Sequence, residues 1–279
     1  MIRRAGDDDL ARLEAFLSRN ADSTMFLRAN LGRAPFWIWG RDGIEGTVGL
    51  SPGEGPRHAL IEMVSPPDWP ALRQALSGYR IAGMNGTPGQ VAALRAGLGL
   101  ADRPAQVDEV EQLLALDLTD LRVPPGPGQL RPATPADLAL LADWRALYRR
   151  EALGDPPTDN RQRAVSDVTA MLERGHVHFL ADGDVPLAMT NFNAVHAGMV
   201  QIGGVFTPAP LRGQGHARRV VALHLAKARA EGTRRAVLFA RDPNALRAYQ
   251  AVGFRNVGGY HLLIFAEPAD PAAPGNAAP

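Results

Sequence analysis

A glycine-rich turn between an apolar run and a helical pattern is the stretch of this sequence best suited to chemistry. The run 199–206 leads into residues 207–215, where Arg212, Gly213 and Gly215 stand just before the helix begins. Main-chain N–H groups at a helix start are unpaired and carry the positive end of the dipole, so they bind phosphate. Glycine lets an anion approach the backbone, and arginine adds a charge-assisted hydrogen bond. The alternative is a plain strand-turn-helix connection.

Two familiar phosphate-binding motifs do not fit this turn. A P-loop requires Lys followed by Ser or Thr after its last glycine, and His216-Ala217 stands there instead. A dinucleotide-binding fingerprint requires a third glycine, and position 218 is Arg. Neither a P-loop nor a dinucleotide site is therefore expected.

The turn resembles the acyl-CoA pyrophosphate motif of the GNAT superfamily of N-acyltransferases. The resemblance rests on Arg212-x-x-Gly215-x-Ala217, after a strand that ends Val205-Phe206-Thr207-x-Pro. A second block is similar to the family pattern Asn-x-x-Ala-x-x-x-Tyr-x-x-x-Gly-Phe, and here it reads Asp242-Pro243-Asn244-Ala245-Leu246-Arg247-Ala248-Tyr249-Gln250-Ala251-Val252-Gly253-Phe254. The two motifs occur in the family's order, and the resemblance covers residues ~130–265.

The resemblance implies acetyl-CoA as the acyl donor and no metal. The pantetheine arm would pair with an open strand edge, where Gly203-Gly204 suits a bulge. The N–H near Val205 would stabilise the thioester oxygen. Arg218 or Arg219 would contact the 3′-phosphate, or both would lie in solvent. The cofactor contacts expected are Val205, Phe206, Thr207, Arg212, Gly213, Gln214, Gly215, His216, Ala217, Arg218, Asp242 and Asn244. Asp242 departs from the family, which usually has Asn there.

Three residues carry the expected catalytic roles. Tyr249 matches the family tyrosine that protonates the departing thiolate, and a phenol with an ordinary pKa of ~10 is protonated at neutral pH. Many relatives have a Glu that acts as the general base on the strand before the turn. This chain has Gln201 there, which would orient a water or the acceptor. Glu151 is the first candidate for the base. Its alternative is a solvated helix-end acid paired with Arg149 or Arg150.

Composition limits the class of protein. The 279 residues are 46% hydrophobic and 21% charged, carry a net charge of +1 and include no cysteine. The charge gives no support to nucleic-acid binding, and no apolar run approaches the ~18 residues needed to span a bilayer. His224, on the apolar face of the helix after the turn, is predicted to be a core histidine. We expect a cytoplasmic protein, either a monomer or a homodimer, that binds neither nucleic acid nor membrane.

The chain is expected to form two domains with an α/β (α+β) GNAT fold in tandem, each with a mixed, mostly antiparallel sheet flanked by helices. The segment Val123–Gly128 is rich in Pro and Gly and predicts a linker. The boundaries are 1–122 for a degenerate GNAT-like domain, 123–128 for the linker, 129–267 for the acetyltransferase domain and 268–279 for a disordered tail. In the first half, a helix opening at 87–90 occupies the place expected for a pyrophosphate turn, and no repeat of individual residues is evident.

Two functions are compatible with these motifs. The first is an N-acetyltransferase that moves an acetyl group from acetyl-CoA to a primary amine of a small molecule or peptide by direct attack. The second is a catalytically idle acyl-CoA-binding protein with a sensing or structural role. Tyr249 favours the enzyme, and Gln201 leaves the idle protein open.

Overall fold

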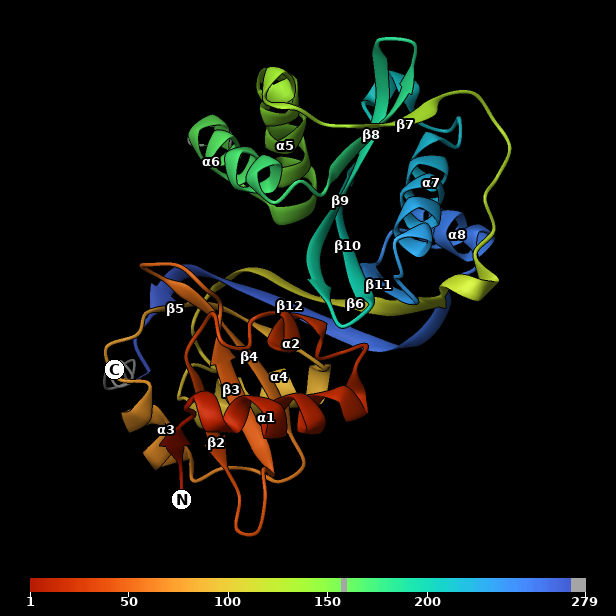
Figure 1. Cartoon of the computed structure of the whole chain (residues 1–279). Coiled ribbons are helices and arrows are strands. Elements are labelled where there is room, and N and C mark those ends of the chain that lie inside the picture. Colours follow the sequence, from red (N-terminus) through yellow and green to blue (C-terminus); the bar gives the residue numbers. More distant parts are fainter. Residues whose placement is uncertain (157–159, 272–279) are drawn as a thin grey trace. The chain divides into compact units, whose positions relative to one another are not determined.

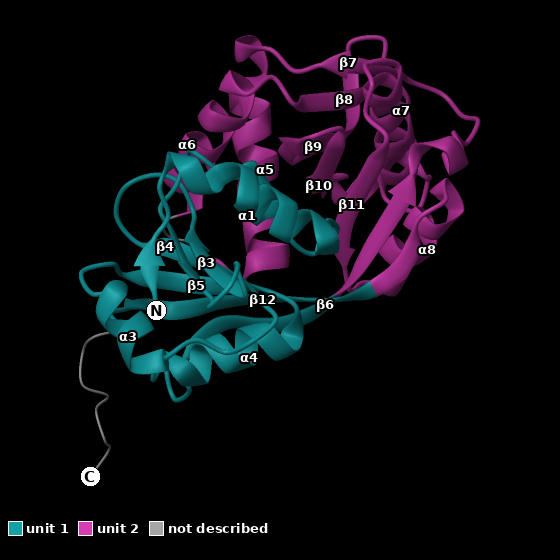
Figure 2. Cartoon of the chain, turned by 60° about the horizontal axis from the view of Figure 1, so that its bottom comes forward, with its two compact units in different colours: residues 1–111, 258–279 teal, residues 112–257 magenta. Residues whose placement is uncertain are grey.

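Two compact units, coloured separately in Figure 2, make up the chain. The computed structural model describes residues 1–156 and 160–271. The first unit combines residues 1–111 with the chain from 258 onward, and the second is residues 112–257. Most of the tail expected at 268–279 lies outside the described residues. Pro268 and Ala269, however, end a strand.

The first half of the chain follows the order strand, two helices, three strands, helix, strand, helix, strand. Its elements are β1 (Arg3–Arg4), α1 (Leu10–Leu17), α2 (Met25–Ala29), β2 (Phe36–Trp39), β3 (Gly46–Leu50), β4 (Arg57–Met63), α3 (Trp69–Ala75), β5 (Ile81–Gly86), α4 (Pro88–Gly97) and β6 (Ala105–Asp117). Helices α1 and α2 pack on one face of its sheet, and α3 and α4 pack on the other.

The second half repeats this order of elements (Figure 1). Its elements are β7 (Gln129–Pro132), α5 (Leu138–Leu153), α6 (Asn160–Glu173), β8 (Val177–Asp182), β9 (Val185–His196), β10 (Met199–Phe206), α7 (His216–Ala230), β11 (Arg235–Ala240), α8 (Pro243–Val252) and β12 (Arg255–Ala269). Figure 1 shows α5 and α6 on one side of strands β8–β10, with α7 and α8 on the other. The expected mixed sheet flanked by helices is confirmed.

Each unit takes its last strand from the other half of the sequence. In the first unit the strand order is β1-β2-β3-β4-β5-β12, and β12 pairs with β5 through His261↔Gly86. In the second unit the order is β6-β11-β10-β9-β8-β7, and β6 pairs with β11 through Leu114↔Leu238. The units therefore divide within β6 and β12, and the segment 123–128 belongs to the second unit.

An ion pair at the start of each unit shows a repeat of individual residues that the sequence analysis missed. Arg3 donates from both Nη atoms to the carboxylate of Asp9 at 2.6 Å, and Arg131 does the same to Asp137 at 2.9 and 2.8 Å. The hydrogen bonds from these arginines lower the pKa of each aspartate to about 2. Both pairs have the same offset (131 − 3 = 137 − 9 = 128).

The repeat continues without a gap into the first helix of each unit. Leu10, the first residue of α1, corresponds to Leu138, the first residue of α5. The fourth residue of each helix is a fully buried leucine, and the seventh is a buried aromatic residue. This common pattern supports the expected tandem arrangement and allows the two units to be compared residue by residue.

Candidate functional site

Strands β10 and β11 run parallel and separate at their carboxyl ends. Their pairing begins at Met199↔Arg235 and stops at Ile202↔Leu238. Beyond that point β10 still pairs with β9, and β11 still pairs with β6. In the described part of the chain, the edge of β10 from residue 203 to 206 is therefore unpaired toward β11, which is the open edge that the motif predicted.

A bulge in β10 lies beside this open edge. Gly203 pairs with Asn191 and Phe206 with Met189, so three steps along β10 match two steps along β9. Gly204 has φ +62, a left-handed conformation that favours glycine. The bulge expected at Gly203-Gly204 is confirmed, and it shifts the alternation of β10 side chains just where its edge opens.

The N-terminus of α7 follows the strand and has no side-chain cap. Its N-cap is Gly215 with φ +82, and no acidic residue lies in the first turn. The first helical hydrogen bond joins Arg219 N to Gly215 O at 3.1 Å, so the N–H groups of residues 216–218 precede the helical ladder. A glycine in this conformation leaves those N–H groups without the competing oxygen that Ser, Thr or Asp would supply. The end of the helix is therefore suited to an external anion.

Arg212 joins the turn to helix α5. Its Nε donates to the carbonyl of Thr207 at 2.9 Å, and its Nη2 donates to Glu151 at 2.8 Å. The guanidinium also lies over the Phe206 ring, 5.6 Å from the centroid. The structure thus brings Arg212 and Glu151 together in an exposed ion pair. The partner of Glu151 in this ion pair is Arg212, in place of the Arg149 or Arg150 considered from the sequence.

The two arginines after the turn have different surroundings. The Arg218 guanidinium lies against Gly215, where an added Cβ would be 3.0 Å from Nε. Arg219 points the other way and donates to the carbonyls of Pro124, Pro127 and Gly128 at 2.5, 2.8 and 3.1 Å. The segment 123–128 is therefore fastened to α7 by Arg219, and Arg218 lies beside the glycine-rich turn.

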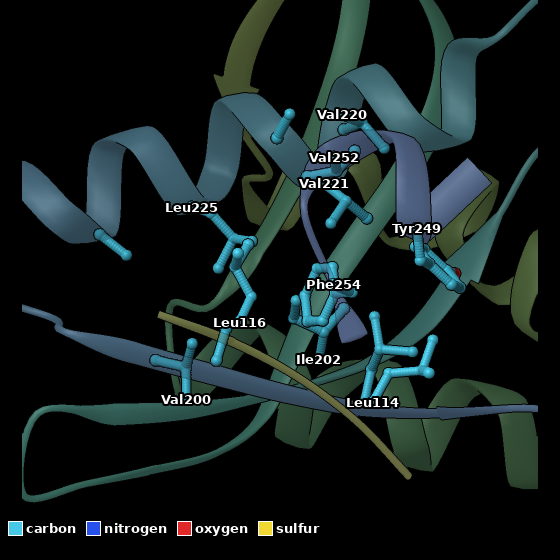
Figure 3. Packing of buried hydrophobic residues seen from close by; sticks show 14 of the residues in the cluster. Leu114, Leu116, Val200, Ile202, Val220, Val221, Leu225, Tyr249, Val252 and Phe254 are labelled. Carbon is cyan, nitrogen blue, oxygen red and sulfur yellow. The ribbon is translucent and has the colours of Figure 1, made fainter. Parts of the chain in front are cut away.

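The second block forms α8 and the turn after it. Asp242 is the N-cap of α8, and its Oδ1 accepts from the N–H groups of Asn244 and Ala245, each at 2.9 Å. The side chain of Asn244 accepts a hydrogen bond from Arg247. Tyr249 is buried, 8% exposed, and packs edge-on against Phe254 at 6.0 Å. Figure 3 shows Tyr249 near Leu114 and Phe254 near Ile202.

Comparisons with known proteins agree with this geometry. Residues 139–254 match the family model described as the acetyltransferase (GNAT) family. These residues form a GNAT domain. No curated protein matches the chain.

Solved structures resemble the chain over nearly its whole length. A GCN5-related N-acetyltransferase from Kribbella flavida has 17% identity and a TM-score of 0.60, with 89% of this chain and 95% of that one covered. A GNAT-family acetyltransferase from Colwellia psychrerythraea has 15% identity and a TM-score of 0.55, covering 95% and 99%. A tandem GNAT protein from the clavulanic acid biosynthesis pathway has 12% identity and a TM-score of 0.55, covering 99% and 100%. At these identities the likeness establishes the fold, including its tandem form.

The face of the GNAT domain covered by α5 and α6 carries Gln201 together with polar side chains that the sequence analysis did not identify. Gln201 is 2% exposed, donates to the carbonyl of Ile202 at 2.7 Å, and leaves its Oε1 without a partner among the described residues. Asn191 Nδ2 donates to Asn193 Oδ1 at 2.9 Å. Arg145, on α5, also reaches this face beside Gly204. The alternation of Asn191 and Asn193 along β9 was the available signal.

The first unit has a capped helix start where the GNAT domain has the uncapped start of α7. Its equivalent connection runs from β4 to α3 at residues 64–68, so the expectation that 87–90 occupies this place is wrong. Asp68 caps α3, and its Oδ1 accepts from Ala71 N at 3.2 Å. Pro70 removes another N–H group from the first turn. An acid therefore occupies the position where the GNAT domain presents free amides.

A cluster of histidines is buried between β8, β9 and α7. His224 is 3% exposed and stacks on Phe192 with a centroid distance of 3.7 Å, and the His178 ring lies 4.2 Å from it. Burial, with a smaller contribution from His178, lowers the pKa of His224 to about 2. His224 is a core histidine, as predicted.

Residues 1–156 and 160–271 contain neither a metal-binding cluster nor a membrane-spanning helix. Among the described residues no group of three or more His, Cys, Asp or Glu side chains is arranged to hold a metal ion. In the same part of the chain, no helix combines the length and apolar character needed to cross a bilayer.

Proposed function

We propose that this chain is an N-acetyltransferase that transfers the acetyl group of acetyl-CoA to a primary amine of a small molecule or peptide. The observation that carries the proposal is the uncapped start of α7 beside the unpaired edge of β10. This arrangement can hold a diphosphate and an extended amide-containing arm at the same time. Membership of residues 139–254 in an acetyltransferase family supports acyl transfer as the reaction.

The donor would be held mainly by main-chain groups. The N–H groups of residues 216–218 would donate to the diphosphate, where the helix dipole favours negative charge. Gln214 and Gly213 would contact the same group from the turn, and Arg218 would add a charge-assisted hydrogen bond. The open edge of β10 would pair with the amides of the pantetheine arm, as an added strand pairs with a sheet edge.

The reaction requires stabilisation of charge at two atoms. The N–H of Val205, just after the bulge, would donate to the thioester oxygen as negative charge develops there. Tyr249 would donate its phenolic proton to the sulfur as the thiolate leaves. Asp242 and Asn244 face solvent at the start of α8, and their predicted contacts with the cofactor belong to this proposal.

An amine acceptor must lose a proton before it attacks, so the site requires a base. Gln201 cannot serve as a base, and its buried amide would position the neighbouring strand or a water molecule. Glu151 stays the first candidate, because it lies at the end of α5 next to the turn. Binding of the donor would compete with Glu151 for Arg212, which would release the carboxylate.

The alternative function is an idle acyl-CoA-binding protein. Both functions require donor binding, so the discriminating measurement is CoA release that depends on an added amine. Screening a library of primary amines with acetyl-CoA would reveal an enzyme through acceptor-dependent free thiol. An idle protein would bind acetyl-CoA in calorimetry and release no thiol with any amine.

Replacing Tyr249 by Phe tests its role as the acid. The ring would still pack against Phe254, so we expect the Kd for acetyl-CoA to change less than about twofold. Turnover should fall by about 10²-fold or more, since positioned acid catalysis contributes 10²–10⁴-fold. Unchanged turnover would remove Tyr249 from the mechanism.

A further inference from the structure

A partly buried arginine lies on the face of the GNAT domain that α5 and α6 cover, and the first unit has no arginine at the equivalent position. Arg145 is the eighth residue of α5, and the eighth residue of α1 is Leu17. Leu17 is fully buried in an apolar cluster. The Arg145 side chain is only 17% exposed. Two units with the same helix pattern therefore differ in chemistry at one position that faces their sheets.

The Arg145 guanidinium is held in a fixed orientation. Its Nε and Nη2 atoms both lie 2.8 Å from Asp167 Oδ2 on α6. Its Cζ atom lies over the Tyr148 ring, 5.1 Å from the ring centroid. The remaining nitrogen, Nη1, has no hydrogen-bond partner among the described residues. It points to the bulge of β10, where a Cβ on Gly204 would lie 3.8 Å from it.

The fold itself gives no reason for this arginine. Arg149 already joins α5 to Asp167 and to Asp155, at 2.8 and 2.6 Å. Replacing a buried ion pair by apolar groups is often neutral or stabilising, and Leu17 shows that an apolar side chain fits the position in this helix pattern. A group that costs desolvation and adds little stability is better explained by a ligand.

A second donor flanks the same bulge. Asn193 uses its Oδ1 to accept from Asn191 at 2.9 Å, which fixes the amide and leaves its Nδ2 facing Gly203. Two hydrogen-bond donors therefore lie beside neighbouring glycines of β10: the Nη1 of Arg145 beside Gly204 and the Nδ2 of Asn193 beside Gly203. Asp167 pairs with the Nε and Nη2 side of the Arg145 guanidinium and balances its charge. The remaining N–H groups of Arg145 and Asn193 can therefore donate to one anionic group.

We propose that Arg145 and Asn193 bind the carboxylate of the acceptor, so that the acceptor is an amino acid. This inference rests on the proposed acetyltransferase function. The thioester oxygen would lie at Val205 N–H, one residue along the strand from Gly204, and adjacent Cα atoms are about 3.8 Å apart. A carboxylate at the bulge and an amine at the thioester are therefore separated by only a few bonds, as in an α- or β-amino acid.

The test compares matched acceptors with acetyl-CoA: standard amino acids, their α-amides and the corresponding decarboxylated amines. We expect the amino acids to be preferred. Arg145→Leu should raise KM for the amino acids on the order of 10- to 100-fold, the effect of losing one charge-assisted hydrogen bond, and should leave the amides unaffected. Arg145→Lys should retain part of the preference. Arg150→Gln, which removes an exposed arginine from the same helix, is the matched control and should behave as the wild type.

Calorimetry with acetyl-CoA on the same variants shows whether the donor site is folded. The proposal is overturned if amides or decarboxylated amines are acetylated as well as amino acids, or if no amino acid is acetylated although acetyl-CoA binds. The proposal is equally overturned if Arg145→Leu slows acetylation of all acceptors alike. It is also overturned if the substitution has an effect only when succinyl-CoA is the donor, because the carboxylate bound by Arg145 would then belong to the acyl group. Absence of acetyl-CoA binding to the wild type would instead refute the proposed function.

Discussion

Replacing Arg218 tests whether the first turn of α7 binds an anion. Its guanidinium lies against Gly215 and has no hydrogen-bond partner among the described residues. One hydrogen bond from a charged group contributes ~1.5–3 kcal/mol. If Arg218 donates to a phosphate of the bound donor, Arg218→Gln should therefore weaken the Kd for coenzyme A by about 10- to 100-fold.

Arg218→Glu should separate binding from stability. A carboxylate about 6 Å from a phosphate charge adds repulsion of ~3 kcal/mol at an effective dielectric constant of about 20, which is roughly a further 100-fold in Kd. The same acid in the first turn interacts favourably with the helix dipole by ~0.3–1 kcal/mol. The melting temperature of the free protein should therefore stay equal or rise while affinity falls.

Arg219→Gln is the control, because it makes the same change one residue further along. Its guanidinium is already bonded to the carbonyls of Pro124, Pro127 and Gly128. The variant should lose stability and keep its affinity for coenzyme A. Calorimetric titration at one fixed ionic strength, together with thermal unfolding, measures both quantities. Wild-type affinity in Arg218→Gln, or an equal loss of affinity in Arg219→Gln, would refute this account of the turn.

Further predictions concern the base, the buried histidine and the first unit. Glu151→Gln should lower kcat/KM most at low pH and change its pH profile, and full activity at every pH would dismiss Glu151 as the base. The unfolded chain binds a proton to His224 below about pH 6.5 and the folded chain does not, so stability present above that pH is lost as the pH falls. In urea unfolding, His224 should contribute ~1.4 kcal/mol to the loss of unfolding free energy at pH 5.5, and His224→Leu should lack that contribution while those of His58, His176 and His178 stay. Phe192→Leu, which removes no titrating group, should weaken the fold equally at pH 7.5 and 5.5. Asp68→Ala should cost ~1 kcal/mol by removing the helix cap and leave coenzyme A affinity unchanged.

Sequence reasoning succeeded where local chemistry decides the structure. The apolar run 199–206, bounded by polar turns, is the strand β10. Thr134 and Gly154 are cap residues that the sequence displays on either side of α5, and Gly154 adopts the left-handed conformation typical of a helix end. The two motifs identified the domain because they contain the residues that shape the turn before α7 and the packing of α8.

Long-range pairing explains what the sequence could not show. The last strand, β12, extends over Arg255–Ala269, and its pairing with β5 runs from His261 to Ala269, beyond the mostly apolar stretch 261–265. The Pro/Gly segment 123–128 is typical of a linker by composition, but the carbonyls that Arg219 binds fasten it to the second unit. The boundary drawn there between two duplicated halves is still a prediction, since compact units and repeated halves need not divide at the same residue.

The repeated ion pair was visible in the sequence, although only the structure gave it meaning. Arg3 and Asp9 have the same spacing as Arg131 and Asp137, within otherwise dissimilar residues. Alignment through this pair places Leu17 opposite Arg145. The candidate acceptor residue emerged from that comparison and had no motif of its own.

Calorimetric titration of the intact chain tests the central claim most directly. Coenzyme A and acetyl-CoA should bind with one site per chain, because Asp68 caps the equivalent helix of the first unit. Pantetheine, which lacks the diphosphate, should bind far more weakly than coenzyme A. Equal affinity for pantetheine and coenzyme A, or no heat with either coenzyme A or acetyl-CoA, would contradict a diphosphate site at the start of α7.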